Sequence, residues 1–282
     1  MSIRTALESE GLRPQKKFGQ NFLTDPRVLA SIAEAADVNA SDTVLEIGPG
    51  LGHLTRALAA RAAQVIAIEL DLGLAKKLQD DLASAPNVTI VQGDFLQAQP
   101  AEWIKQATKE AGIFPASFKV VANVPYYITS AILRHLLEAE IKPSVIVLTV
   151  QKEVAQRIVA QPPRMNLLAV SAQFFSQPRI VRTIAAGAFY PRPKVDSAVV
   201  RFDVLPRPMA TEVRSESFFR VVRAGFGERR KQLRNALAHN LKLTPEVITA
   251  ALERAHLAPT RRAETLNVNE WVELCKVLAH ES

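Results

Sequence analysis

Cysteine is almost absent from this 282-residue chain, and Cys275 is the only one. A single thiol excludes an intramolecular disulfide bond and a zinc site built from several cysteines, and it suits a reducing compartment. The five histidines are scattered, with no two at the spacing of metal ligands, so we expect no metal. Cys275 follows Trp271 and Leu274 and precedes Leu278 at helix-core spacing, which predicts a packed side chain and not a nucleophile.

Long apolar runs are also missing. The longest strongly apolar strand candidate, residues 145–150, is far too short to cross a bilayer. Residues 1–13 are polar and lack the apolar centre of an export signal. We therefore expect a cytoplasmic protein with no membrane-spanning segment.

Basic residues exceed acidic ones by 35 to 28, and the excess is local. Residues 1–150 have a net charge of −2, and residues 235–282 have a net charge of −1. Between them, residues 151–234 hold 16 basic and 6 acidic groups, a net charge of +10. A segment with this charge is the footprint expected for contact with a phosphate backbone, and a merely soluble basic face is the alternative.

The apolar periodicity alternates between strand and helix up to about residue 203 and is helical afterwards. Such alternation builds an α/β fold with a mostly parallel sheet. The proline-rich stretch 205–209 is typical of a linker, so we predict a first domain over residues 1–204 and a smaller all-helical domain over residues 210–282. The expected strands are residues 43–47, 64–68, 88–92, 118–122, 144–150, 179–184 and 197–202. The expected helices are residues 27–36, 53–62, 72–83, 130–139, 152–160, 215–224, 229–240, 245–255 and 269–280.

Three features with ligand-binding chemistry follow successive predicted strands. The first strand leads into a glycine turn at Gly48 and Gly50, where the backbone can approach a ligand closely. His53 occupies the place of a further glycine in the usual dinucleotide loop, so a nucleoside without a pyrophosphate fits better. The second strand ends at Glu69, where doubly wound folds place the carboxylate that accepts ribose hydroxyl groups, and Asp94 after the third strand suits a cofactor's adenine amine. A solvated strand end and a turn residue are the plain alternatives for these carboxylates.

The tetrapeptide Asn123-Val-Pro-Tyr126 follows another short apolar run and has a narrow chemistry. The Asn123 side chain and the Val124 carbonyl can accept the two N–H bonds of an exocyclic amine, and Pro125 fixes the backbone between these acceptors and Tyr126. The Tyr126 ring can stack on the base. The pattern indicates methyl transfer to an adenine N6 amine, and an ordinary strand-ending turn is the alternative.

These motifs together resemble the small-subunit rRNA adenine N6,N6-dimethyltransferases of the KsgA (RsmA) type. The resemblance runs nearly end to end and is carried by residues 17–23 (KFGQNFL), 46–50 (EIGPG), 67–69 (AIE), 93–94 (GD), 123–126 (NVPY), 151–154 (QKEV), 189–200 (FYPRPKVDSAVV) and 229–235 (RRKQLRN). It implies a Rossmann-like class I methyltransferase sheet with a helical C-terminal RNA-binding domain. It also implies that the chain, acting as a monomer, dimethylates two adjacent adenosines in the 3′-terminal hairpin loop of 16S rRNA within a small-subunit assembly intermediate.

The resemblance further implies the cofactor and the roles of individual residues. S-adenosylmethionine would be held by six residues: Asn21, Leu23, Gly48, Glu69, Asp94 and Asn123. The target adenine would be flipped out and sandwiched between Tyr126 and Phe189. The chain departs from the family pattern at Tyr127, where Asn is usual, and over residues 164–169, where a different run is common. Both departures concern the target side of the site and not the chemistry.

The basic run Arg229, Arg230, Lys231 and Arg234 is expected to bind RNA phosphates, although consecutive charges also suit a solvated helix face. Residues 16–21 contain too few apolar residues to form core, and a lid over the cofactor is favoured. Two rival functions remain. An Erm-type enzyme acting on 23S rRNA would share the cofactor loop and the tetrapeptide, and a non-catalytic RNA-binding or assembly factor, or a transcription factor, would share the fold.

Overall fold

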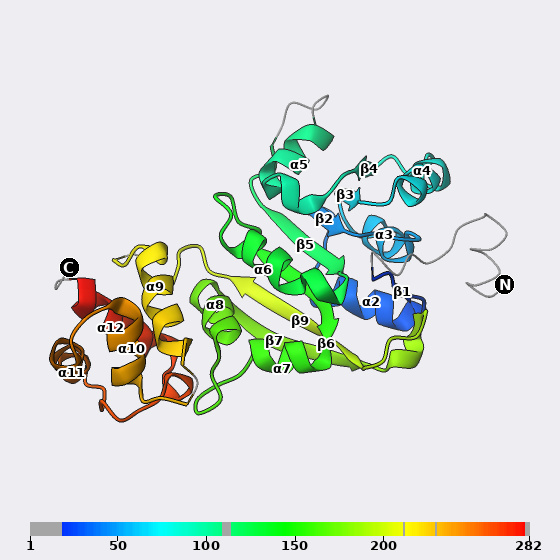
Figure 1. Ribbon diagram of the computed structural model, residues 1–282. Coiled ribbons are helices and arrows are strands. Elements are labelled where there is room, and N and C mark those ends of the chain that lie inside the picture. The colour runs from blue at the N-terminus through cyan, green and yellow to red at the C-terminus, as the bar shows by residue number, and fades with distance from the viewer. Residues whose placement is uncertain (1–18, 109–113, 211, 229, 280–282) are drawn as a thin grey trace. The chain divides into compact units, whose positions relative to one another are not determined.

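The computed structural model describes residues 19–108, 114–210, 212–228 and 230–279 (Figure 1). The chain divides into two compact units. The sheet unit comprises residues 1–155 and 179–204, and the helical unit comprises residues 156–178 and 205–282.

A seven-stranded sheet forms the centre of the sheet unit, with strand order β4-β3-β2-β5-β6-β9-β7 among the described residues. Strands β4, β3, β2, β5 and β6 are parallel neighbours, and β9 pairs antiparallel with β6. This confirms the predicted mostly parallel sheet. Its strands are β2 (Thr43–Ile47), β3 (Gln64–Glu69), β4 (Val88–Gln92), β5 (Phe118–Asn123), β6 (Val145–Gln151), β7 (Ser176–Ile184) and β9 (Ser197–Val204).

Helices flank this sheet (Figure 1), and the two over residues 26–35 and 72–81 begin at aspartate side chains that cap them. Asp25 and Asp71 each accept hydrogen bonds from amides of the first helical turn, which satisfies donors that have no partner within the helix. The helices are α2 (Pro26–Ala35), α3 (His53–Ala59), α4 (Leu72–Asp81), α5 (Pro100–Ala107), α6 (Thr129–Leu137) and α7 (Lys152–Ile158). The prediction missed α5, which is short and adds only Trp103 and Ile104 as large buried side chains.

Two short strands far apart in the sequence pair beside the sheet. In β1 (Phe22–Leu23) and β8 (Phe189–Tyr190), Phe22 lies opposite Tyr190 and Leu23 lies opposite Phe189. Leu23 and Phe189 are 4% exposed and belong to one hydrophobic cluster with residues of α2 and α3. The segment that leads into α2 is therefore attached to the chain just before β9.

The helical unit is built around α9 (Ser215–Phe226), α10 (Leu233–Leu241), α11 (Pro245–Arg254) and α12 (Val268–Ala279). It also includes α8 (Leu167–Phe175), a helix that the sequence analysis missed. Phe174 of α8 stacks on Phe218 of α9 with ring centroids 4.1 Å apart, and Phe175 packs against Phe219. These aromatic contacts explain why residues 156–178 group with the helical unit, whereas the prediction placed them in the first domain.

The structure corrects the start of one predicted helix in this unit. Helix α10 begins at Leu233 and not at Arg229, because Gln232 is extended and the Leu233 amide donates to the Arg261 carbonyl at 2.7 Å. Arg230 and Lys231 therefore lie in the turn before the helix, and Arg229 lies outside the described residues. Cys275 is 3% exposed on α12, as predicted for a packing residue, and burial raises the pKa of its thiol to about 12.

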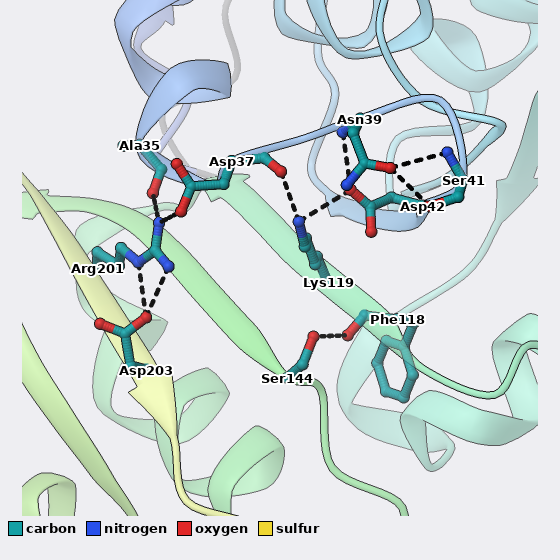
Figure 2. Close-up of polar contacts among 10 residues, drawn as sticks. All are labelled: Ala35, Asp37, Asn39, Ser41, Asp42, Phe118, Lys119, Ser144, Arg201 and Asp203. Atoms are coloured by element: carbon teal, nitrogen blue, oxygen red, sulfur yellow. Dashed lines mark hydrogen bonds and ion pairs between the residues drawn. The ribbon is translucent and has the colours of Figure 1, made fainter.

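A polar cluster ties the loop after α2 to the amino end of β5 and to β9 (Figure 2). Lys119 Nζ donates to the Asp37 carbonyl at 2.6 Å and to Asp42 Oδ2 at 2.8 Å. Arg201, with 11% of its side chain exposed, pairs with Asp37 and Asp203 and also donates to the Ala35 carbonyl. Lys119 is the second residue of β5 and Asn123 is the last, so the cluster anchors the end of the strand away from the tetrapeptide.

Within the described residues no helix is long and apolar enough to cross a bilayer, and no group of three or more His, Cys, Asp and Glu side chains could hold a metal ion.

Candidate active site

A pocket lies at the carboxyl ends of β2, β3, β4 and β5. Its lining comes from segments that are separate in the sequence: residues 19–23, the glycine turn with the start of α3, and the residues that follow β3, β4 and β5. Ligands of open α/β sheets bind at this edge, because the loops after parallel strands converge there.

The glycine turn after β2 forms one wall of the pocket. Gly48, Gly50 and Gly52 have φ of 69°, 58° and 73°, a backbone region that residues with a side chain rarely adopt. A Cβ at Gly48 would meet no atom within 4 Å, so this stretch of backbone faces open space. At Gly52 a Cβ would lie 2.5 Å from Leu78, which closes the turn against α4. The turn thus offers bare backbone to a ligand on one side while its other side is packed.

Glu69 joins the glycine turn to the end of β3. Its carboxylate accepts hydrogen bonds from the Gly50 amide at 3.0 Å and from the Asp71 amide at 2.9 Å. The residue is 5% exposed, and this burial raises its pKa. Each carboxylate oxygen can accept more than one bond, so the group retains acceptor capacity toward the pocket.

Asp94 lies beside Glu69 at the end of β4. It caps a 3₁₀ turn (η2, Phe95–Gln97) by accepting from the Leu96 amide at 3.1 Å, and the buried Phe95 ring lines the pocket next to it. A Cβ at the preceding Gly93 would lie 2.4 Å from Trp103, so glycine is required at this bend. Asp94, which was expected near a cofactor adenine, therefore lies at the pocket together with the Phe95 ring.

Asn123 connects the end of β5 to the segment before β1. Its Nδ2 donates to the Asn21 carbonyl at 3.1 Å, and Asn21 Nδ2 donates to the Gly19 carbonyl at 3.0 Å. His53 Nδ1, in the first residue of α3, is 3.3 Å from the Leu23 carbonyl in β1. This contact links β1 to the helix that follows the glycine turn. Burial lowers the pKa of His53. The six residues predicted to hold the cofactor, Asn21, Leu23, Gly48, Glu69, Asp94 and Asn123, all line this one pocket.

The two tyrosines after β5 differ in their surroundings. Tyr126 is partly buried, its hydroxyl lies 2.7 Å from Ser197 Oγ at the start of β9, and burial raises its pKa. Tyr127 has 64% of its surface exposed at the pocket edge, next to Gly19. Neither the contact with Ser197 nor the place of Tyr127 in the pocket lining was predicted. The Tyr126–Ser197 contact joins residues 71 positions apart, so no local pattern indicates it.

For Phe189, the proposed contact with the target adenine stays a prediction. Its side chain is 4% exposed in the hydrophobic cluster behind β1, and it is not one of the residues that line the pocket.

The titratable side chains in the described lining of the pocket are mostly acidic. Its described lining contains the carboxyl groups of Glu46, Glu69 and Asp94, together with His53, and neither Lys nor Arg. This composition suits a ligand with a positive charge, such as the sulfonium of S-adenosylmethionine.

The predicted RNA-binding residues lie in the helical unit, apart from Arg229, which is outside the described residues. Arg230 and Lys231 are exposed, and Lys231 pairs with Glu228 at 2.9 Å. Arg234 is in the first turn of α10 and donates to Asn235 at 3.3 Å.

A sequence profile described as "Ribosomal RNA adenine dimethylase" matches residues 11–280. The chain belongs to this family. It is therefore an enzyme that dimethylates adenine in ribosomal RNA with S-adenosylmethionine as its cofactor, as the resemblance implied.

Curated relatives cover nearly the whole chain. A protein named ribosomal RNA small subunit methyltransferase A from Dehalococcoides mccartyi (strain ATCC BAA-2266 / KCTC 15142 / 195) is 46% identical over 271 residues, which are 96% of this chain and 90% of the relative. A protein of the same name from Moorella thermoacetica is 42% identical over 276 residues, 97% of this chain and 96% of the relative.

Solved structures agree on the fold. The structure of the 23S rRNA methyltransferase ErmE is 31% identical with a TM-score of 0.71, covering 92% of this chain and all of ErmE. A dimethyladenosine transferase from Plasmodium falciparum has a TM-score of 0.75 at 24% identity, covering 90% of this chain and 95% of that one. The Rossmann-like methyltransferase fold is thus confirmed.

Proposed function

We propose that this chain dimethylates the N6 amines of two adjacent adenosines in the 3′-terminal hairpin loop of 16S rRNA. We propose further that it acts as a monomer in the cytoplasm on a small-subunit assembly intermediate. The curated relatives support the choice of subunit: those with 42–46% identity over at least 95% of this chain bear the small-subunit name, whereas the Erm structure is 31% identical.

The observation that carries the proposal is the convergence of six residues on one pocket. Asn21, Leu23, Gly48, Glu69, Asp94 and Asn123 come from five separate segments of the chain and line the same cavity. In this proposal, Glu69 accepts the ribose hydroxyls and Asp94 accepts the adenine amine. The backbone at Gly48 leaves room for the methionine part, because no atom would contact a Cβ there. The cofactor, when bound, supplies an electrophilic methyl group on a positively charged sulfur.

Asn123 is proposed to orient the target amine at the edge of this pocket. Its Nδ2 is committed to the Asn21 carbonyl, so its Oδ1 is the atom that can accept an N–H bond from the base. The Val124 carbonyl is the second acceptor, and the Val124 side chain is 2% exposed, which holds this part of the backbone in place. Two fixed acceptors turn the lone pair of the amine away from themselves and toward the pocket.

Tyr126 is proposed to stack on the flipped base, with its ring held from the hydroxyl end by Ser197. The resemblance assigns Phe189 to the opposite face of the base. Because Phe189 is buried between β1 and β9 residues, that role requires the β1–β8 pair to shift when RNA binds.

The chemistry needs no general base with a matched pKa. The N6 nitrogen becomes acidic only as its bond to carbon forms, so its proton can pass to the carbonyl acceptors or to water after the barrier. Orientation and exclusion of water would supply most of the acceleration. A second methylation has to proceed with one N–H left, so one of the two acceptors then has no partner on the base.

The helical unit is proposed to hold the RNA backbone through Arg229, Arg230, Lys231 and Arg234. The exposure of Arg230 and Lys231 supports this, as does the net charge of +10 in residues 151–234. Lys231 is paired with Glu228 and has to exchange this partner for a phosphate.

Mapping N6,N6-dimethyladenosine in 16S and 23S rRNA from cells with and without this protein tests the proposal. We expect adjacent modified adenosines near the 3′ end of 16S rRNA that disappear with the gene. Loss of a modification in 23S rRNA instead would favour the Erm-type function, which the similarity to ErmE keeps as the second candidate. An unchanged pattern in both RNAs would contradict the proposal.

A further inference from the structure

Glu46 is a buried carboxyl group in the pocket that the proposed mechanism does not use. It lies in the middle of the sheet, on β2, with Ala67 of β3 and Val121 of β5 as its neighbours on either side. The residue is 1% exposed, yet it lines the pocket. Its Oε2 and the nearby hydroxyl of Thr55, which is 0% exposed on α3, are both buried without a hydrogen-bond partner. An unpartnered buried carboxyl oxygen is costly, so its presence at a ligand pocket points to a partner on the ligand.

The groups around Glu46 make the pocket electronegative. Glu69 is the last residue of β3, Asp94 follows β4 and His53 begins α3, while β5 contributes the neutral Asn123. The next cation on α3 is Arg56, which is turned to the Leu51 carbonyl at 3.0 Å and to Asp81 at 3.4 Å. The described lining residues thus include no Lys or Arg that could neutralise the carboxyl groups.

This environment keeps Glu46 protonated while no ligand is bound. Burial raises the pKa of Glu46 to about 8. The Thr55 hydroxyl lowers this pKa and the Glu69 carboxylate raises it, both to a smaller extent than burial. Burial also lowers the pKa of His53, so this imidazole supplies no compensating positive charge near pH 7. A cation brought next to Glu46 would favour its ionised form.

We propose that Glu46 releases its proton when S-adenosylmethionine binds, so that its carboxylate faces a cationic group of the cofactor's methionine part. The only bond broken is the carboxyl O–H, and the proton goes to bulk water. The inference rests on the proposed cofactor pocket and assigns to Glu46 a role in charge recognition at that site.

The proposal predicts the direction in which cofactor affinity changes with pH. If the cofactor binds only the ionised form, its affinity rises as the pH approaches the pKa of Glu46 in the free protein. With that pKa at about 8, the ionised fraction grows roughly ninefold from pH 6 to pH 7, and the dissociation constant should fall by the same factor. The window stays at or below pH 7 because the cofactor's own α-amino group titrates at about 7.7–8.0.

Calorimetric titration of the full chain with S-adenosylmethionine at pH 7, in phosphate and in Tris, counts the protons released. We expect about 0.9 proton per cofactor from Glu46, because a group with a pKa of about 8 is about nine-tenths protonated at this pH. Glu46→Gln should lower the count by that amount and flatten the change in affinity between pH 6 and pH 7. Any proton from Glu69 is common to both proteins and cancels in the difference.

Glu212→Gln is the matched control. It removes a carboxylate that pairs with Lys276 at 2.8 Å in the helical unit, and it should leave the proton count unchanged. Thermal unfolding reports whether Glu46→Gln retains the fold. If that variant fails to fold, the unmodified protein still tests the inference: release of well under about 0.9 proton per cofactor, or an affinity that does not rise from pH 6 to pH 7, overturns it.

A parallel titration with S-adenosylhomocysteine identifies the cation. This product keeps the ammonium group and lacks the sulfonium charge, so release with both ligands assigns the ammonium, and release with S-adenosylmethionine alone assigns the sulfonium. Cofactor binding without proton release, or with a release that Glu46→Gln does not change, overturns the inference and leaves the proposed function intact. If the protein does not bind the cofactor at all, the assignment of this pocket to the cofactor is wrong.

Discussion

The amide nitrogen of Asn123 donates to the backbone carbonyl of Asn21, 3.1 Å away, across 102 residues of sequence. This bond fixes the orientation of the Asn123 side chain and leaves its oxygen as the acceptor. It also makes Asn123 common to the two halves of the proposed site, because the residue lines the cofactor pocket and begins the tetrapeptide that would hold the target base. Changes at Asn123 should therefore affect both cofactor binding and methyl transfer, whereas changes at residues that belong to one half alone should affect only that half.

Glu69→Ala should weaken cofactor binding. The carboxylate is 5% exposed, and its loss removes charge-assisted bonds to the ribose, at a cost of about 1.5–3 kcal/mol in cofactor binding free energy. Calorimetry measures this change, and RNA affinity, measured separately, should stay the same. Cofactor affinity within about twofold of the unmodified protein would show that the ribose assignment is wrong.

Tyr126 should act through its ring and not through its hydroxyl. Tyr126→Phe and Ser197→Ala each break the 2.7 Å contact and keep the ring, so both should retain methylation rates within a few fold. Tyr126→Ala removes the stacking surface and should raise the RNA concentration needed for half-maximal rate by roughly 5- to 150-fold, equivalent to about 1–3 kcal/mol. Equal losses in Tyr126→Phe and Tyr126→Ala would assign the effect to the hydroxyl instead.

Phe189 can be tested for a role beyond packing. Phe189→Ala should lower the free energy of unfolding by about 3–5 kcal/mol, because the side chain is 4% exposed in a hydrophobic cluster. Phe189→Leu fills most of the space and should fold, but it lacks the flat ring that stacking requires. If Phe189→Leu methylates RNA at the normal rate, the residue is a core residue only and the sandwich proposal fails.

Replacing Arg229, Arg230 and Arg234 together by Gln should weaken RNA binding and flatten its salt dependence. The expected change in the log–log slope is up to about 0.7–0.9 for each lost phosphate contact. The triple replacement of Arg27, Arg61 and Arg134 by Gln removes the same charge from the sheet unit and serves as the control. An equal drop in RNA affinity in both variants would mean that RNA binding depends on the net charge of the protein and not on the basic residues around the start of α10.

Most strands of the sheet could be predicted from the sequence because they are short apolar runs bounded by turn residues. Strand β7 is the exception, because it is mostly polar and exposed, and it begins at Ser176, three residues before the predicted range. Parallel strands present their carboxyl ends at one edge, so the convergence of Glu69, Asp94 and Asn123 followed from the order of the motifs. Two helices could not be predicted in this way. Helix α8 is apolar on nearly all sides, so it lacks the pattern of a half-exposed helix, and α5 has only a short apolar stripe.

The parts of the site that the sequence did not reveal depend on long-range contacts. The burial of Phe189 follows from its pairing with Leu23, 166 positions earlier, and no local pattern indicates that pair. Glu46 reads as one residue of a buried strand, and its unpartnered oxygen becomes evident only when the sheet encloses it. The turn before α10 depends on a bond between Leu233 and Arg261, which the run of basic residues does not indicate.

Single-turnover methylation of small-subunit precursor particles by Asn123→Ala, at saturating S-adenosylmethionine, tests the central claim most directly. The variant lacks the acceptor that orients the amine while nitrogen bonds to carbon, and removal of one such oriented hydrogen bond costs about 2.7 kcal/mol, or about a hundredfold in rate. Saturation with cofactor separates this effect from weaker binding in the shared pocket. We predict a rate about a hundredfold below that of the unmodified enzyme, and a variant that retains more than about a third of the normal rate would contradict the catalytic role of Asn123.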